Sequence, residues 1–480
     1  MRRAEILLAI ALCASTAACS LAPPYAAPPP PQIASYKEDK GWTQAQPADA
    51  LPRDGWWKVF KDPVLDGLEV KVEQGNPTLA QALARYQAAQ GYLGVARSAE
   101  GPRLGSTGTV SRNRQSDNRP LRGSNQPDEY ANDSIGVQLD YEVDLWGRVR
   151  NEVAAQKANV EASAGDLASV RLSMEVQLAD DYVQLRGLDA EAGLLDQTVK
   201  AYQHTDALIA KRHADGLSSK LDVDRSRTLL ETARAQASDI ASRRALVEHA
   251  IASLTGQPAS TFDLPPQAMA VSAPNTPPTV PSELLQRRPD VAAAERRMAA
   301  ANAEIGVARA AFFPVISLDG TAGYQNTGGP NLLTAPNSYW GVGPQLLFTI
   351  FDSGRRHAQE DVAKAQYDQA AAAYKGQVLQ AFQDVEDALS LENRLAAEAA
   401  DQAQAVQAAE EAQTLALKRF QRGVVSYLDV VTAQTAALQA EQAAFDLMTR
   451  RSQASIRLVR AIGGGWEAPD IKTASAEVGR

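Results

Sequence analysis

The chain has 480 residues and a formal net charge of −9 at pH 7. This acidic balance argues against nucleic acid as a main partner. Hydrophobic residues make up 45% of the chain and aromatic residues only 6%, so alanine, leucine and valine supply most of the apolar side chains. Such a composition favours long helices over a large globular core.

The first residues have the pattern of a secretion signal. A basic start, Arg2-Arg3, precedes an apolar run over 6–12 that is too short to span a bilayer, and small residues then lead to Cys19. This pattern looks like a bacterial lipobox, so we predict a lipoprotein signal peptide over 1–18 and an acylated Cys19 at the mature N-terminus. The alternative is an ordinary signal peptide that happens to contain a cysteine. Lipidation better explains a secreted chain that keeps a single cysteine.

Residues 19–52 are rich in proline, alanine and glutamine, which predicts an extended, lipid-attached tether. Ser20 follows the cysteine, which favours the outer membrane by resemblance to other bacterial lipoproteins. A folded segment begins near residue 53 with Trp56-Trp57 and Asp62-Pro63. No later segment is a candidate membrane-spanning helix, so any membrane crossing must use strands.

A helix is predicted over 77–100, and a strand hairpin over 103–145 follows it. Its strands are expected at 103–113 and 135–145 around a polar loop, because apolar residues alternate along the second strand.

A helical hairpin is then predicted over 147–255, because no proline interrupts it and Gly216 marks its one weak break. The break divides it into a helix of about 65 residues, about 100 Å long, and a shorter helix over 219–255. The helices 77–100 and 219–255 together nearly match the long helix in length. We therefore expect them to stack end to end.

The second half of the chain repeats the first. The stretch that begins at Pro77 reappears at Pro289, an offset of 212 residues, and Gly216 reappears as Gly423, an offset of 207 residues. A repeat this long predicts an internally duplicated molecule rather than a solenoid. The predicted parts are a first repeat at 53–256, an equatorial linker at 257–288, a second repeat at 289–463 with a strand hairpin at 315–351 (strands 315–324 and 340–350) and a helical hairpin at 353–462, and a C-terminal tail at 464–480.

Heptad spacing in the second half predicts helix-on-helix packing. The two predicted seams are Val378, Phe382, Val385 and Leu389, and Leu428, Val431, Thr435, Leu438, Gln442 and Phe445. A plain coiled coil would explain the seams but not the strand hairpins.

Four strands per chain cannot close on themselves, and open sheet edges are not tolerated in lipid. A homo-oligomer is therefore required. Two copies would give eight strands and three would give twelve, and strand number alone does not choose between them. A lipidated ring of strands and long helices is typical of a conduit.

Several motifs are more specific than this pattern. They are the lipobox at Cys19, Gly55-Trp56-Trp57 with Phe60 and Asp62-Pro63, the run 281–290, Ile305-Gly306-Val307-Ala308 with Phe312-Phe313-Pro314, and Ile462-Gly463-Gly464-Gly465-Trp466. Together they resemble the TolC-like outer-membrane factors of tripartite efflux systems, in the lipoprotein branch typified by OprM and NodT.

The resemblance implies a mainly α fold with a membrane β-barrel. It implies a homotrimer with a 12-stranded β-barrel on a 12-helix periplasmic α-barrel, and a mixed belt built from segments near 53–75, 256–288 and 463–480. It also implies a lipid anchor in the cell outer membrane, extension into the periplasm, a periplasmic adaptor (membrane fusion) protein and an inner-membrane pump of the RND type.

The resemblance also implies where the pore residues lie. The hairpin tips at Gly216 and Gly423 would dock the adaptor, and Leu428, Asp429 and Thr432 would form the periplasmic constriction. Asp429 has a simpler alternative role, because a carboxylate is favoured near any helix N-terminus. Some relatives lock this region with Tyr and Arg, where this chain has Phe420 and Val425.

No enzyme, cofactor or metal site is expected. The four histidines, His204, His213, His249 and His357, fall in predicted helices without metal or triad spacing. The predicted function is a passive outer-membrane channel that exports small molecules such as drugs. The alternatives are an exit duct for protein secretion or metal efflux, or a lipid-anchored coiled coil without a pore.

Overall fold

The computed structural model describes residues 20–28, 37–38, 55–116, 118, 127–267 and 288–464. The predicted signal peptide, Cys19, most of the linker and nearly all of the C-terminal tail lie outside these residues. The chain divides into two compact units. Unit 1 holds Met1–Pro28, Arg85–Ala164 and Ala293–Lys375, and unit 2 holds Pro29–Ala84, Gly165–Ala292 and Gly376–Arg480.

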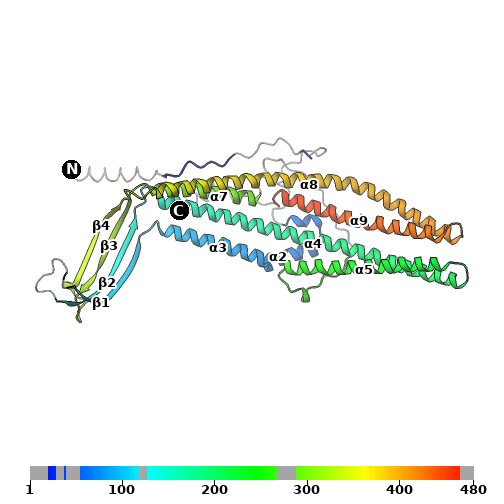
Figure 1. The fold of residues 1–480 in the computed structure, drawn as a ribbon, viewed down its shortest axis with the longest axis horizontal. Coiled ribbons are helices and arrows are strands. Elements are labelled where there is room, and N and C mark those ends of the chain that lie inside the picture. The colour runs from blue at the N-terminus through cyan, green and yellow to red at the C-terminus, as the bar shows by residue number, and fades with distance from the viewer. Residues whose placement is uncertain are drawn as a thin grey trace. The chain divides into compact units, whose positions relative to one another are not determined.

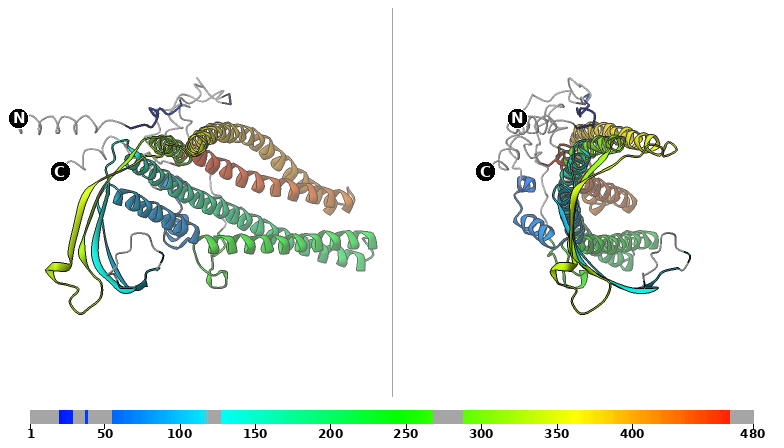
Figure 2. Two further views of the ribbon diagram at one scale, coloured as in Figure 1. Left: turned by 60° about the vertical axis from the view of Figure 1, so that its left-hand side comes forward. Right: turned by 90° about the vertical axis from the view of Figure 1, so that its left-hand side faces the viewer.

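Unit 1 contains one antiparallel sheet in the order β1-β2-β3-β4 (Figure 1). The strands are β1 (Arg103–Arg114), β2 (Glu129–Glu142), β3 (Val315–Asn326) and β4 (Ser338–Leu347). The two halves of the chain meet where β2 pairs with β3, for example at Val137 opposite Ala322. Figure 2 shows from two further sides that the strands curve. The prediction of four strands in two hairpins is confirmed.

All four strands differ from their predicted bounds, β1 and β3 by one or two residues at the end and β2 and β4 at both ends. β2 begins at Glu129, six residues before the apolar alternation, because its polar start still pairs residue by residue with the end of β1, up to Arg114 opposite Glu129. Backbone pairing does not depend on side-chain polarity, so the alternation marked only part of the strand. β4 covers Ser338–Leu347 rather than 340–350.

Three pairs of helices confirm the duplication by their equal lengths. The helices are α2 (Pro63–Gly75), α3 (Pro77–Ser98), α4 (Arg148–Ala214), α5 (Lys220–Leu254), α7 (Pro289–Ala310), α8 (Arg355–Gln421) and α9 (Tyr427–Ala461), with short 3₁₀ turns at Trp56–Phe60, Ala259–Thr261 and Ala335–Asn337. The counterparts α3 and α7 have 22 residues each, α4 and α8 have 67, and α5 and α9 have 35. None of the helices in the described part of the chain is both long and apolar enough to cross a membrane.

The main core of unit 2 forms where the Trp56–Phe60 turn and α2 cover α4, α5 and α9. Its fully buried members include Trp56, Leu65, Tyr182, Ile251 and Ile456. The Asp62 carboxylate starts α2 by accepting hydrogen bonds from the amides of Val64 and Leu65, and it also accepts one from the Tyr182 hydroxyl at 2.6 Å. The Asp62-Pro63 motif thus begins a helix and joins it to α4.

The predicted seam on α8 is confirmed, because Val378, Phe382, Val385 and Leu389 are all buried. The predicted seam on α9 is wrong at its start. Leu428 is exposed, and the buried side chains there are Tyr427 and Val430. These two face Ile209 of α4 and Phe420 of α8, so the position of neighbouring helices, rather than the heptad spacing, sets the register.

The predicted end-to-end stacking is visible at Asn76, between α2 and α3. Its side-chain oxygen accepts hydrogen bonds from the amides of Thr78 and Leu79 at the start of α3, and its side-chain nitrogen donates to the Leu254 carbonyl at the end of α5 (2.9 Å). One buried amide therefore satisfies a helix start and a helix end.

The second half uses a different residue at the equivalent place. Arg288 lies 212 residues after Asn76 and donates to the Ala461 carbonyl at the end of α9 (3.1 Å). The same guanidinium pairs with Asp290 at 2.7 Å and with Asp384 at 2.9 Å. In both halves, a side chain at this position therefore binds the end of the shorter hairpin helix. The first half uses the amide of Asn76, and the second half uses the ion-paired guanidinium of Arg288.

Candidate functional site

The tips of the two helical hairpins in unit 2 contain most of the predicted site residues. Gly216 and Gly423 both have left-handed backbones, with φ of 75° and 73°. At the second tip the Gly423 amide donates to the Phe420 carbonyl and the Val424 amide to the Arg419 carbonyl, at 2.9 and 3.0 Å. This pairing ends a helix in a Schellman turn, which a residue with a Cβ would strain. A Cβ at either glycine would have nothing within 4 Å.

Each returning helix then begins with the same capping box. Ser219 pairs with Asp222 at the start of α5, and Ser426 pairs with Asp429 at the start of α9. The Asp429 carboxylate accepts hydrogen bonds from the Ser426 amide and hydroxyl, at 2.9 and 2.6 Å. The Ser426 hydroxyl lowers the pKa of Asp429 most, followed by the Ser426 amide. Asp429 is therefore ionised near neutral pH and stabilises the helix start.

The three residues predicted to form the constriction lie together on the exposed side of the first turns of α9. Leu428 has 47% of its surface exposed, and Asp429 and Thr432 are also exposed. The Thr432 hydroxyl donates to the Leu428 carbonyl at 2.9 Å, so it adds no free donor to this face. In the first half, Leu221 is 57% exposed beside the capping Asp222, but Asp222 is half-buried and lies 3.8 Å from the guanidinium of Arg225, which stands where the second half has Thr432.

A buried cluster on the opposite side of α9 joins the second tip to the first hairpin. Phe420 and Tyr427 pack with ring centroids 5.4 Å apart, and Ile209 and Val430 complete the cluster. The Arg212 guanidinium of α4 lies 5.0 Å from the Phe420 ring centroid, a cation–π contact. Sequence reasoning placed Phe420 here but missed Arg212 and Tyr427. The available signal was their spacing, because Arg212 precedes Gly216 by as many residues as Tyr427 follows Gly423.

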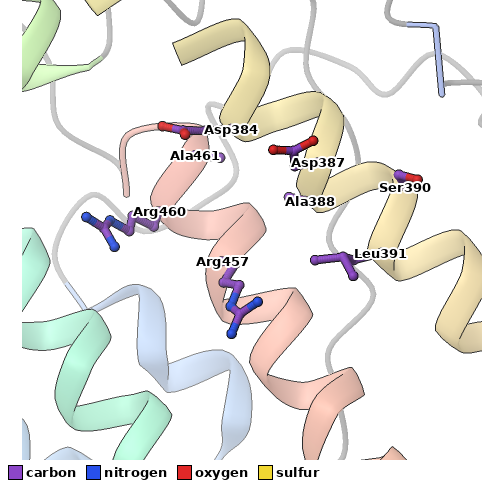
Figure 3. Close-up of a pocket in the computed structure, with 8 residues that line it drawn as sticks. All are labelled: Asp384, Asp387, Ala388, Ser390, Leu391, Arg457, Arg460 and Ala461. Atoms are coloured by element: carbon purple, nitrogen blue, oxygen red, sulfur yellow. The ribbon is translucent and has the colours of Figure 1, made fainter. Parts of the chain in front are cut away.

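A separate pocket of about 630 Å³ lies between α8 and α9 (Figure 3). Asp384 and Asp387 line it from α8, and Arg457 and Arg460 line it from α9. The carboxylates of Asp384 and Asp387 accept hydrogen bonds from nearby side chains, including Arg288 and Gln383. Among the described residues, no group of three or more His, Cys, Asp or Glu side chains is placed to hold a metal ion.

Comparison with known proteins shows which family has this architecture. The family model described as "Outer membrane efflux protein" matches twice, at residues 69–257 and 280–464. The chain is 32% identical over 467 residues to the outer membrane protein OprJ of Pseudomonas aeruginosa, covering 96% of this chain and 95% of that protein. It is 32% identical over 454 residues to the antibiotic efflux pump outer membrane protein ArpC of Pseudomonas putida, covering 93% of each.

A solved membrane protein from Pseudomonas aeruginosa has a similar structure, with a TM-score of 0.85, 32% identity, and coverage of 93% of this chain and all of that one. The duplicated fold and these matches define a TolC-like outer-membrane efflux channel. The chain belongs to the outer membrane efflux protein family.

Proposed function

We propose that the chain is the exit channel of a tripartite drug-efflux pump. It would conduct small toxic molecules passively, after an RND-type transporter of the inner membrane and a periplasmic adaptor deliver them. The names of its relatives support this proposal, since ArpC is named as part of an antibiotic efflux pump. An acylated Cys19 would add a lipid anchor in the outer membrane, and the turns at Gly216 and Gly423 would meet the adaptor.

The observation that carries the proposal is the open four-stranded sheet. Within the described residues, β1 pairs only with β2 and β4 only with β3, so the sheet has two edges whose backbone groups lack a partner strand. Large apolar side chains are exposed along the strands, among them Leu104, Val110, Val137, Trp340, Val342 and Leu346. Edges of this kind favour closure by further copies in lipid, and we propose that three copies close the ring.

The constriction is proposed at the exposed face of Leu428, Asp429 and Thr432. In a trimer this face would gather three Asp429 carboxylates around the pore, with Leu428 as its apolar neighbour. The capping role of Asp429 is compatible with this, because only one of its two oxygens accepts from Ser426.

The two matched tips allow the channel role of Asp429 to be separated from its capping role. Asp429→Asn and Asp222→Asn both remove the charge from a capping box, so both should weaken a helix start similarly. We expect only Asp429→Asn to lower the preference for potassium over chloride, by roughly a factor of two or more, because a ring of charge in a narrow pore focuses the field. Single-channel recordings in planar bilayers measure this preference.

The same recordings also include the results that would contradict the proposal. Equal changes in selectivity from Asp429→Asn and Asp222→Asn would place the constriction elsewhere. No conductance from the wild-type protein would contradict the channel itself.

A further inference from the structure

Residues 20–28 lie against α7 in unit 1 and form a segment that we call the strap (dark blue in Figure 1). Arg309 donates to the Leu21 carbonyl at 3.4 Å, and Asn302 donates to the Pro23 carbonyl at 2.9 Å. The Tyr25 hydroxyl donates to the Glu295 carboxylate and to the Glu295 carbonyl. The strap therefore runs antiparallel to the helix.

The contacts follow one face of α7. Residues 295, 302, 306 and 309 are spaced by seven, four and three, which places them on one stripe of a helix. At Gly306 there is no room for a side chain, since an added Cβ would lie 2.8 Å from the Ala22 Cβ of the strap and 2.5 Å from the Asn151 side-chain nitrogen of α4. A side chain at this position would therefore press on both the strap and Asn151, which holds the strap.

Two buried asparagines hold the strap by polar contacts. Asn302 and Asn151 are 6% and 5% exposed. The Ser20 hydroxyl donates to the Asn151 oxygen at 2.8 Å, which fixes the residue that directly follows Cys19. Removal of the strap would leave both amides without these partners in a nearly dry site, which is unfavourable. Pro23 and Pro24 restrict the free strap, so less entropy is lost when it docks.

The duplicated half provides an internal comparison. The positions on α3 that correspond to Gly306 and Asn302 are Gly94 and Gln90. A Cβ at Gly94 would have nothing within 4 Å, and Gln90 is exposed. The face that contacts the strap is therefore a property of α7 and not of the repeat in general.

We infer that the strap is a docking segment that holds the lipid-anchored start of the chain at the strand end of α7. Leu21 lies beside Arg309 in the last turn of α7, and β3 begins at Val315. An acyl group on Cys19 would thus be directed to a lipid surface beside the first residues of the strands. The membrane part of this inference rests on the lipid anchor proposed above, and the docking part does not.

Chymotrypsin cleavage after Tyr25, followed by mass spectrometry of the purified full chain, tests the docking. We expect the wild-type bond to be protected and Gly306→Leu to be cleaved about tenfold faster, since opening of the segment governs cleavage. Gly94→Leu, the matched substitution in the first half, should leave the bond protected. Asn302→Ala removes a strap contact without adding bulk and should also speed cleavage, which covers the case in which Gly306→Leu fails to fold.

A Cys19→Ala variant separates docking from lipid attachment. If the contacts with α7 hold the strap, the Tyr25 bond stays protected in this variant. Protection that disappears with Cys19→Ala, or that survives both Gly306→Leu and Asn302→Ala, would overturn the inference. Because channel activity is read from conductance and docking from cleavage, failure of one proposal leaves the other measurable.

Discussion

At the scale of single residues, Glu69 is a carboxyl group in a site suited to a neutral side chain. It lies on α2, is 2% exposed, and neither of its carboxyl oxygens has a hydrogen-bond partner. Burial is the largest cause that raises its pKa, to about 10, and the carboxylates of Glu175 and Asp66 add to this. Glu69 is therefore protonated at neutral pH in the folded chain.

This protonation makes stability depend on pH. In the unfolded chain the pKa of Glu69 returns to about 4.3, so folding takes up a proton between about pH 4.3 and pH 10. Over that window its contribution to stability falls by about 1.4 kcal/mol for each pH unit of increase. Glu69→Gln should remove this slope and raise the unfolding midpoint at pH 8 more than at pH 6.

Thermal unfolding of the purified protein between pH 5 and pH 9 measures the effect. Glu73→Gln, one turn further along α2 and exposed, is the control and should keep the wild-type slope. Identical slopes for the wild type and Glu69→Gln would mean that Glu69 is ionised in the folded chain.

At the scale of elements, the helix ends are held by side chains that join one element to another. Asn76 caps α3 and also binds the last carbonyl of α5. Asn76→Ala should lower the free energy of unfolding by about 0.5–2 kcal/mol, the usual effect of losing an N-cap, with the lost α5 contact placing it toward the upper end.

The urea midpoint at fixed protein concentration measures this loss. Asn76→Asp is the informative comparison, because a carboxylate still caps α3 but cannot donate to the Leu254 carbonyl. If Asn76→Ala unfolds at the wild-type midpoint, this junction does not stabilise the fold.

Much of the order and length of the helices and strands could be predicted from the sequence, because their signals were strong and occurred twice. The glycine breaks, the lengths of the long helices and the end-to-end stacking followed from proline spacing and simple length. The seam of α9 could not be predicted in the same way. Leu428 and Tyr427 are adjacent and both apolar, and only the presence of Phe420 and Ile209 decides which one is buried.

The strap was predicted less well. Proline-rich composition indicated an extended tether, but nothing in the residues 20–28 indicates that α7 binds them. The signal lay elsewhere, in the pair Gly94 and Gly306, and only the structure shows which of the two glycines has a neighbour.

At the scale of the whole molecule, the two open edges of the sheet are the basis of the proposed trimer. We expect cross-linking of the detergent-extracted protein to give bands that stop at three chains, because further copies would have no free edge to join. Gel electrophoresis after a short cross-linking reaction shows the ladder, and protein unfolded before cross-linking serves as the control. A stable single chain with native helix content, or a ladder ending at two, would contradict the trimer.

The difference of five residues between the two offsets has a definite place. Between the end of the first strand and the start of the long helix lie residues 115–147 in one half and 327–354 in the other, whereas every matched helix is equal in length. One residue added inside α8 would turn everything beyond it by about 100° and advance it by about 1.5 Å. The face that carries Leu428 would then no longer correspond to that of Leu221. Among the described elements, the two copies therefore differ in length in the part that holds the strand loop and the second strand, where β2 has 14 residues and β4 has 10, while the paired helices keep their length although their sequences differ.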